Sequence, residues 1–323
     1  MSTIHVLYEN EDWLPPLREA LTQAELPFEE HFTAGGVLDL AESPPEGVYL
    51  NRMSPSSHTR GHQSGVTYTR ELLGLLEASG RRIVNGSRAF TLELSKLQQD
   101  AALRAAGIRT PHTIGVVAHD AKAAARRLVG PFITKHNQGG KGLGVHLFDD
   151  LSTFDRFVDD GGLDDSSPDG IVVLQQYIRP AEPFITRVEI VDGRFQYAIR
   201  SSTAGGFQLC PADACAVEAT APGDAFCPVG ADADDGRFTL ASEVHGDDPL
   251  VQQYIQFLAA NHIDLAGIEY VTDAAGQRWT YDVNGTTNYN PAVESAHGLS
   301  GMRALAALAR RELTARYGAV RAA

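Results

Sequence analysis

A glycine-rich loop between two strand-like segments constrains the fold more than any other feature of this sequence. The segment PFITKHNQGGKGLGVHLF, residues 131–148, has apolar or β-branched flanks and four glycines in the loop between them. Such flanks predict a β-hairpin, so the loop does not open a helix as a Walker or dinucleotide-binding loop would. Glycines let backbone N–H groups approach anionic oxygens, and Lys135 and Lys141 add positive charge. We interpret the loop as a flap over phosphate groups; a solvent-exposed hairpin with incidental lysines is the alternative.

The first part of the chain alternates strands with helices. Buried strands are expected at 3–8 and 48–52, and helical patterns follow each of them. This alternation predicts an open, largely parallel sheet that ends near Gly86. One continuous helix is then expected across 93–107, because apolar residues recur there at helical spacing.

Beyond the glycine-rich loop, strands follow one another directly. The dipeptide Asp192-Gly193 and the DAAG turn at 273–276 lie between alternating segments and predict two antiparallel hairpins. Between these hairpins, residues 204–248 are rich in Gly, Ala, Asp and Pro and are interpreted as a long loop or insertion. The expected fold class is α/β (α+β).

Composition narrows the function classes. The 323 residues carry a formal net charge of −14, which disfavours nucleic acid and anionic membranes as partners. No apolar run approaches the ~18 residues of a membrane span, and acidic residues near the N-terminus do not fit a secretory signal, so a cytoplasmic location is expected. The three cysteines suit reduced thiols better than disulfides; a zinc site is the sharper alternative for Cys210, Cys215 and Cys227.

A set of hard oxygen ligands lies in the second predicted hairpin. Asp282 and Asn284 share one face of a strand because side chains alternate. Direct pairing across the DAAG turn would set Glu269 opposite Thr280, with Asp282 as its diagonal neighbour. Carboxylate and amide oxygens suit an octahedral Mg²⁺ ion, or Mn²⁺, that also binds phosphate. An edge hairpin with an ordinary polar face is the alternative.

A pair of arginines is expected in the first hairpin. A two-residue turn at Asp192-Gly193 would set Arg187 opposite Ala198, and Arg200 would then lie diagonally on the same face. Two guanidinium groups in fixed positions suit a phosphoryl group or a substrate carboxylate. Surface ion pairing with Glu189 is the alternative.

The order of these segments resembles the RimK-like α-L-glutamate ligases of the ATP-grasp superfamily over essentially the whole chain. This sequence departs from the family at Ser95, where an Asp is usual, and in the exchanged acids Glu269 and Asp282. The matching segments are VNG at 84–86, SKLQQ at 95–99, GIRTPHT at 107–113, PFITKHNQGGKGLGV at 131–145, LQQYI at 174–178, RVEIVDGRF at 187–195, GIEY at 267–270 and YDVN at 281–284.

This resemblance implies an ATP-grasp fold with an N-terminal open α/β domain and with ATP held between two antiparallel sheets. It divides the chain into an N-terminal domain (1–86), a central lid domain with the glycine-rich loop (87–175), and a C-terminal domain with the metal site and the cysteine-containing insertion (176–323). It implies catalytic roles for Arg187, Arg200 and Lys141 and metal binding by Glu269, Asp282 and Asn284. The implied ATP-binding residues are Lys96, Lys135, Gly139, Gly140, Gly142, Gln176, Tyr177 and Ile178.

The expected function is that of an ATP-dependent carboxylate–amine ligase, which forms an acyl phosphate and releases ADP and phosphate. A small-molecule kinase of the same superfamily is one alternative, and a nucleotide-binding regulatory protein without turnover is another. The expected partners are amino acid or peptide substrates, with neither nucleic acid nor membrane, and a homo-oligomer is left open.

A donor-rich loop follows the strand at 48–52. Residues 51–65, NRMSPSSHTRGHQSG, combine hydroxyl, imidazole and guanidinium side chains. Loops at the carboxyl ends of strands in open α/β sheets commonly bind ligands. A substrate-binding role is therefore predicted for this loop, and a solvated loop with local hydrogen bonds is the alternative. The residues concerned are Arg52, His58, Arg60 and His62.

Overall fold

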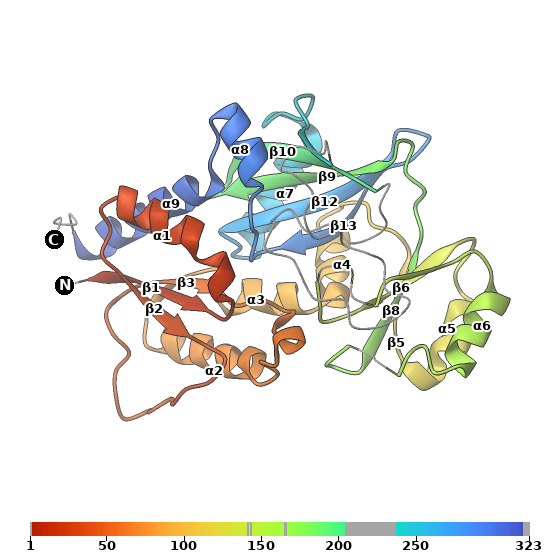
Figure 1. Ribbon diagram of the computed structural model, residues 1–323, viewed down its shortest axis with the longest axis horizontal. Coiled ribbons are helices and arrows are strands. Elements are labelled where there is room, and N and C mark those ends of the chain that lie inside the picture. Colours follow the sequence, from red (N-terminus) through yellow and green to blue (C-terminus); the bar gives the residue numbers. More distant parts are fainter. Residues whose placement is uncertain (1, 141, 143, 165–166, 204–236, 319–323) are drawn as a thin grey trace.

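The computed structural model of the protein describes residues 2–140, 142, 144–164, 167–203 and 237–318. Lys141, predicted to be catalytic, and the three cysteines, the alternative zinc ligands, lie outside the described residues. The described helices and strands are arranged around three sheets (Figure 1). None of the described helices has the length and apolar character needed to cross a membrane.

The first sheet is wholly parallel, as predicted, with the strand order β2-β1-β3-β4. Helix α1 packs on one face of this sheet and α2 on the other (Figure 1). The edge strand β2 was not predicted, because its sequence FEEHF carries three polar residues in a row and little apolar alternation. The elements are β1 (Thr3–Tyr8), η1 (Glu11–Trp13), α1 (Pro15–Gln23), β2 (Phe28–Phe32), β3 (Gly47–Arg52), η2 (Ser57–Arg60), α2 (Gly65–Ala78) and β4 (Arg82–Val84).

Two helices, not one, lead out of the first sheet. They are α3 (Ser87–Leu94) and α4 (Lys96–Ala105), so the prediction of one continuous helix across 93–107 is wrong. Ser95 between them has an extended backbone, with φ −132° and ψ 106°, and its hydroxyl accepts a hydrogen bond from the N–H of Gln98. Serine is a favoured N-cap because it satisfies a free N–H in this way. The break makes Lys96 the first residue of α4.

The second sheet contains the glycine-rich hairpin. Its order is β5-β8-β6-β7, and all of its pairings are antiparallel. The predicted hairpin at 131–148 is confirmed by the pairing of β6 with β7. Helices α5 and α6 cover one face around a core of aromatic rings. The elements are β5 (Thr113–Val117), η3 (Ala118–Asp120), α5 (Ala121–Ala125), β6 (Phe132–His136), β7 (His146–Phe148), α6 (Leu151–Asp159) and β8 (Ile171–Gln176).

The third sheet is antiparallel, with the order β11-β10-β9-β12-β13. Both predicted hairpins are present, and Asp192 and Gly193 have φ of 56° and 65°, as a turn with two left-handed residues requires. The strands are β9 (Phe184–Val191), β10 (Arg194–Ser202), β11 (Phe238–Leu240), β12 (Leu265–Thr272) and β13 (Arg278–Asn284). The helices around it are α7 (Pro249–Ala260), α8 (Pro291–His297) and α9 (Gly301–Tyr317).

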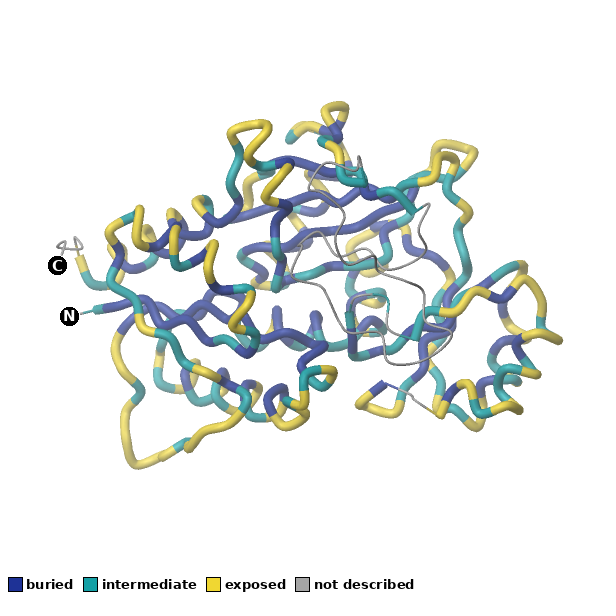
Figure 2. The backbone as a smooth tube through the Cα atoms, in the orientation of Figure 1, coloured by how far each residue is buried: buried dark blue, intermediate teal, exposed yellow. Residues whose placement is uncertain are grey.

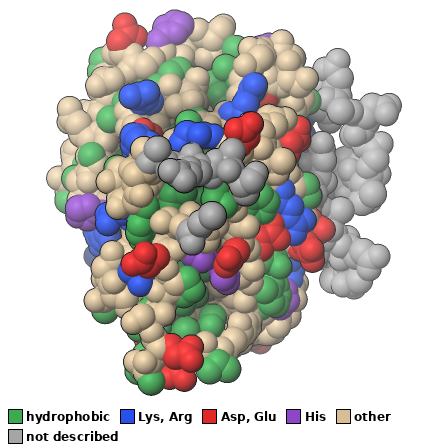
Figure 3. Space-filling model, turned by 90° about the vertical axis from the view of Figure 1, so that its left-hand side faces the viewer, with side chains coloured by type: hydrophobic (Ala, Val, Ile, Leu, Met, Phe, Trp, Pro, Cys, Tyr) green, Lys and Arg blue, Asp and Glu red, His purple; other side chains and the backbone are tan. Residues whose placement is uncertain are grey.

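Helix α9 joins the first and third sheets. Its Leu305 and Leu308 belong to one apolar cluster with Ile4 of β1 and Val191 of β9. Figure 2 shows that buried residues concentrate in the strands, whereas the long connection between β2 and β3 is exposed. At the end of the molecule that carries the first sheet, acidic and basic side chains are interspersed (Figure 3). The shared core fixes the first sheet against the third, which forms one wall of the site described next.

Candidate active site

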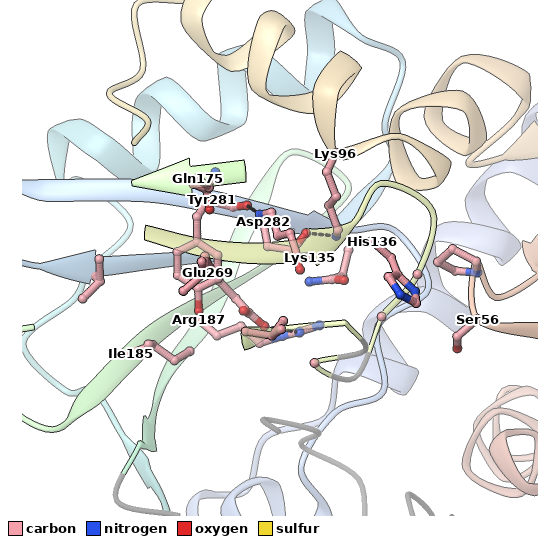
Figure 4. Close-up of a pocket in the computed structure, with 18 of the residues that line it drawn as sticks. Ser56, Lys96, Lys135, His136, Gln175, Ile185, Arg187, Glu269, Tyr281 and Asp282 are labelled. Atoms are coloured by element: carbon pink, nitrogen blue, oxygen red, sulfur yellow. Dashed lines mark hydrogen bonds and ion pairs between the residues drawn. The ribbon is translucent and has the colours of Figure 1, made fainter. Parts of the chain in front are cut away.

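A cavity of about 410 Å³ lies between the second and third sheets (Figure 4). Its lining comes from β6, β8, β9, β12 and β13, from the glycine-rich loop, from the start of α4 and from the segment after β3. Twelve of the residues singled out in the sequence lie along its wall, although they come from distant parts of the chain. They are Lys96, Lys135, Gly139, Gly140, Gly142, Gln176, Tyr177, Ile178, Arg187, Glu269, Asp282 and Asn284.

The two acids face each other more directly than predicted. Glu269 pairs with Asp282 and Tyr270 with Thr280, so Tyr281 is an extra residue in a β-bulge. The predicted pairing of Glu269 with Thr280 is therefore wrong by two residues, one from a longer turn, since Thr272 pairs with Arg278, and one from the bulge. The bulge brings both carboxyl groups to the same place on the sheet, and both line the cavity.

Arg187 is buried among the acids. Its guanidinium donates to Glu189 at 2.6 Å, to Glu269 at 2.9 Å and to the Thr287 hydroxyl at 2.6 Å. Gly267 makes room for this group, because a Cβ there would lie 2.3 Å from Nη2 of Arg187. Burial raises the pKa of Glu269, and the Arg187 charge opposes that rise. The carboxylates in turn hold the pKa of Arg187 above its usual value although the side chain is buried. This arginine is held firmly in a single position.

Two lysines approach the acids from the other side of the cavity. Lys96 reaches from α4 to form an ion pair with Asp282, and Lys135 reaches from β6 to within 3.4 Å of the Tyr281 carbonyl oxygen (Figure 4). Burial lowers the pKa of Lys135 to about 8, although the charge of Asp282 opposes the fall. Burial alone would raise the pKa of Asp282, but Lys96 and Lys135 hold it below its usual value. The cavity thus contains cations and hard oxygen ligands at short range.

One part of the cavity is apolar. Ile133, Ile185 and Val271 line it, one from each of three strands of the two facing sheets. The chain beside them runs from β8 into residues 176–178. The N–H of Gln176 donates to the His112 carbonyl at 2.8 Å, and the N–H of Tyr177 donates to the Pro131 carbonyl at 2.9 Å. Since these two donors are engaged, a main-chain N–H contact to a planar base would fall to Ile178.

No protein-family model and no curated protein matches this sequence. Solved structures do match it over nearly the whole chain. The RimK-domain ATP-grasp protein of Sphaerobacter thermophilus DSM 20745 aligns with a TM-score of 0.66 and 14% identity, covering 95% of this chain and 98% of that one. D-cycloserine synthetase DcsG aligns with a TM-score of 0.64 and 19% identity, covering 95% of this chain and 99% of that one. The ATP-grasp ligase PsnB, solved with a minimal precursor, Mg and ADP, aligns with a TM-score of 0.64 and 14% identity, covering 97% of this chain and 98% of that one.

This chain has the ATP-grasp fold. The resemblance found in the sequence is thereby confirmed for the architecture: two antiparallel sheets enclose the cavity, and an open α/β sheet precedes them. At 14% to 19% identity, the likeness to these structures shows the fold alone.

The second arginine of the predicted pair is not in the ATP-grasp cavity. Arg187 pairs with Ile199, not Ala198, because the register shifts by one residue between Phe195 and Tyr197. Arg200 therefore lies on the opposite face from Arg187. It pairs with Glu243 at 2.8 Å and lies over the Phe184 ring, 4.5 Å from the ring centre. The prediction that the two arginines share a face is wrong.

The loop after β3 borders the cavity, but through Ser54, Pro55 and Ser56. None of the four side chains predicted to hold substrate lines the described part of the cavity. Arg52 is buried and donates to the Thr287 carbonyl at 3.0 Å and to the Asn288 side chain at 2.8 Å. It therefore acts on the cavity only indirectly, by holding Asn288 in the cavity wall. His58 lies within the short helix η2.

Arg60 and His62 of the same loop are bound to a buried carboxylate. Arg60 donates to Glu9 at 2.6 Å and 2.8 Å, and the His62 ring lies 2.7 Å from Glu9. These partners hold the pKa of Glu9 below its usual value although its burial opposes this. The guanidinium carbon of Arg60 lies over the ring of Trp13, 5.3 Å from the ring centre, and Trp13 lines the cavity. The cluster supports the cavity wall from behind.

Glu93 is a cavity residue that the sequence did not reveal. It lies in the last turn of α3, is 6% exposed, and accepts hydrogen bonds from the Thr286 N–H at 2.8 Å and the Thr286 hydroxyl at 3.2 Å. Burial raises the pKa of Glu93 to about 7 in spite of these bonds. A single Glu in a helical pattern gives no sequence signal of this kind.

Proposed function

We propose that this protein is an ATP-dependent carboxylate–amine ligase that activates an acid as an acyl phosphate and joins it to an amine. The observation that carries the proposal is the cavity itself, in which Lys96, Lys135 and Arg187 meet Glu269, Asp282 and Asn284 beneath a glycine-rich loop. Support also comes from the names of structural neighbours, which include a ligase solved with Mg and ADP and two synthetases.

ATP is placed with its base at the apolar part of the cavity and its phosphates toward the two lysines. The backbone N–H groups of Gly139 and Gly140 add donors for the phosphates. Glu269, Asp282 and Asn284 fit Mg²⁺ or Mn²⁺, because all three offer hard oxygen atoms on one wall. A divalent ion bound there would neutralise phosphate charge and orient the nucleotide.

The reaction then follows from charge and position. A carboxylate oxygen of the acid attacks the γ-phosphorus, the bond to the bridging oxygen breaks, and ADP leaves. The amine nitrogen attacks the carbonyl carbon of the acyl phosphate, phosphate departs with a former carboxylate oxygen, and the amine gives up a proton. Arg187, held by Glu189 and Thr287, stabilises the negative charge on the transferring group. No protein nucleophile takes part.

The acid and amine are placed at the polar end of the cavity, where Ser54, Ser56, Glu93 and Asn288 form the lining. Glu93 is the carboxyl group there whose pKa lies near neutrality, so it can accept the proton that the amine loses. The resemblance to α-L-glutamate ligases makes L-glutamate the first substrate to test, as the acid and as the amine.

A screen of amino acids and peptides, singly and in pairs, tests the proposal through substrate-dependent ADP release and mass spectrometry. The expected product is an adduct formed with loss of water. With an acid labelled with ¹⁸O in its carboxylate, one labelled oxygen should appear in the released phosphate. A phosphorylated product without phosphate release would identify a kinase instead. ATP binding without ADP release across the whole panel would identify a regulatory protein, and the ligase proposal would be abandoned.

A further inference from the structure

A second group of ligand-type side chains lies on the first sheet, away from the ATP-grasp cavity. His5 belongs to β1, and Glu29 and His31 belong to the neighbouring strand β2. One atom from each side chain lies within 4.8 Å of the other two. They share a face because His5 pairs with Glu29 in the register and His31 follows two residues later. Figure 3 shows histidine and acidic side chains exposed at this end of the molecule.

The distances are close to those of a metal-bound set. Nδ1 of His5 lies 2.9 Å from Nε2 of His31, and a Glu29 oxygen lies 3.7 Å and 4.0 Å from these two nitrogens. Ligand atoms around a tetrahedral zinc ion lie about 3.3 Å apart, given bonds of about 2.0–2.1 Å. Each separation therefore needs to change by only about 0.4–0.7 Å to hold a zinc ion.

His5 is oriented as metal-binding histidines are. Its other ring nitrogen, Nε2, lies 3.3 Å from the Glu46 carbonyl oxygen. A hydrogen bond donated to that carbonyl leaves the lone pair on Nδ1, on the side of His31 and Glu29. The ring stacks on Tyr49 with centres 4.5 Å apart. Gly47 packs against its edge, where a Cβ would lie 2.7 Å from Cδ2 of His5. The imidazole is fixed before any ligand arrives.

The charge state of the two imidazoles and the access from solvent also fit a metal site. Burial lowers the pKa of His5 and of His31, which favours the neutral imidazoles that metal ions bind. The His5 side chain is 1% exposed, but the side chains of His31 and Glu29 are 39% and 62% exposed, so an ion can enter from solvent. Two imidazoles and one carboxylate leave a fourth tetrahedral position for water.

The simpler explanation is a hydrogen bond from the His31 ring to Nδ1 of His5. That bond accounts for the distance of 2.9 Å between the rings. This hydrogen bond, however, leaves the negative Glu29 carboxylate 3.7 Å from Nδ1 of His5. Two electron-rich atoms at this distance repel each other, and a cation bound by both would remove the repulsion. We propose that His5, Glu29 and His31 bind a divalent transition metal ion of the zinc class, which ties the edge strand β2 to β1.

Zinc titration of the full-length protein tests this site. The protein is stripped with a chelator, its three cysteines are blocked with iodoacetamide, and Mg²⁺ is kept in excess to compete at the cavity. Calorimetry should then show one equivalent of Zn²⁺ bound by the parent, with a rise in melting temperature. His31→Gln should lose this equivalent and the rise, and Glu29→Gln should weaken binding at least about tenfold. His31 and Glu29 are partly exposed, so these variants should fold.

His119→Gln, an exposed histidine paired with Asp120, is the matched control and should bind like the parent. Co²⁺ in place of Zn²⁺ provides a second readout, since a tetrahedral site gives intense visible bands that His31→Gln should abolish. Equal zinc stoichiometry and affinity in the parent and in His31→Gln would overturn the proposal and leave a His–His hydrogen bond. The site is independent of the proposed ligase activity.

Discussion

Charged side chains cluster both on the cavity wall of the third sheet and in the loop after β3, but the two clusters differ in how their charges are paired. In the loop cluster, the carboxylate of Glu9 is fully engaged by Arg60 and His62. In the cavity, Asp282 and Glu269 face cations that border open space, so a ligand can take over either partner. A charged cluster whose groups are all paired within the protein thus stabilises the fold, whereas a cluster of similar composition that borders a cavity can bind a ligand.

The largest effect is expected from Asp282→Asn, which keeps the shape of the side chain but removes a ligand charge. Turnover should fall by at least about 100-fold, because the divalent ion would lose a carboxylate, while the melting temperature changes little. ADP release over a range of Mg²⁺ concentrations measures this. Asp247→Asn, an exposed acid near α7, is the control. Full activity at ordinary magnesium concentrations would move the metal site elsewhere.

Lys135→Met should weaken ATP binding by about 10- to 100-fold, because a phosphate-facing cation in a partly dry cleft is lost. Thermal stability should hold or rise. The folded pKa of Lys135 is about 8, below the ordinary 10.5, so this lysine costs stability below pH 8 and the cost fades as pH rises toward 10.5. Titration calorimetry and melting curves check both points. Lys122→Met on α5 is the control, and an ATP affinity equal to that of the parent would contradict the phosphate role.

The pH dependence of ATP binding is a second test of whether the charge of Lys135 in the cavity is available to a ligand. Phosphates favour the charged amine, so above pH 8 binding should take up a proton at Lys135 and weaken as pH rises. Calorimetry in buffers of different ionisation enthalpy measures the uptake. Lys135→Met should lose it. The same uptake in the variant would assign the proton to another group.

Arg60→Ala should act on stability and leave ATP binding almost unaltered. It breaks a buried pair at Glu9, at a cost of about 1–3 kcal/mol in the free energy of unfolding. Glu9 has a lowered pKa, so its contribution is present above the ordinary Glu pKa of 4.5 and is lost as pH falls below it. Urea unfolding at pH 7 and at low pH measures both effects. Arg18→Ala, which breaks the more exposed pair with Glu30, should cost less.

Much of the fold could be predicted, because strands and hairpins depend on apolar alternation and on turn residues, both of which can be recognised in the sequence. Register could not be, because a bulge inserts one residue without a sequence signal. In the second hairpin, a turn longer by one residue and a bulge together set Asp282 directly opposite Glu269, which strengthens the predicted metal site. The bulge in the first hairpin turned Arg200 away from Arg187. The role of Glu93 could not be predicted for a different reason, since its partner Thr286 is distant in the sequence and only the folded chain brings the two together.

Arg200→Ala should have the smallest effect, and it tests the bulge in the first hairpin. Arg200 lies on the face opposite Arg187 and pairs with Glu243, whose side chain is 51% exposed. An exposed pair of this kind contributes about 0–0.5 kcal/mol, so melting temperature and turnover should both stay close to those of the parent. Arg187→Lys is the matched variant. It keeps the charge but loses the fork that reaches Glu189, Glu269 and Thr287 together, so turnover should fall while ATP still binds. If Arg200→Ala instead lowered turnover tenfold without changing stability, Arg200 would act on the acyl phosphate after all, and β10 would have to shift by one residue when substrate binds.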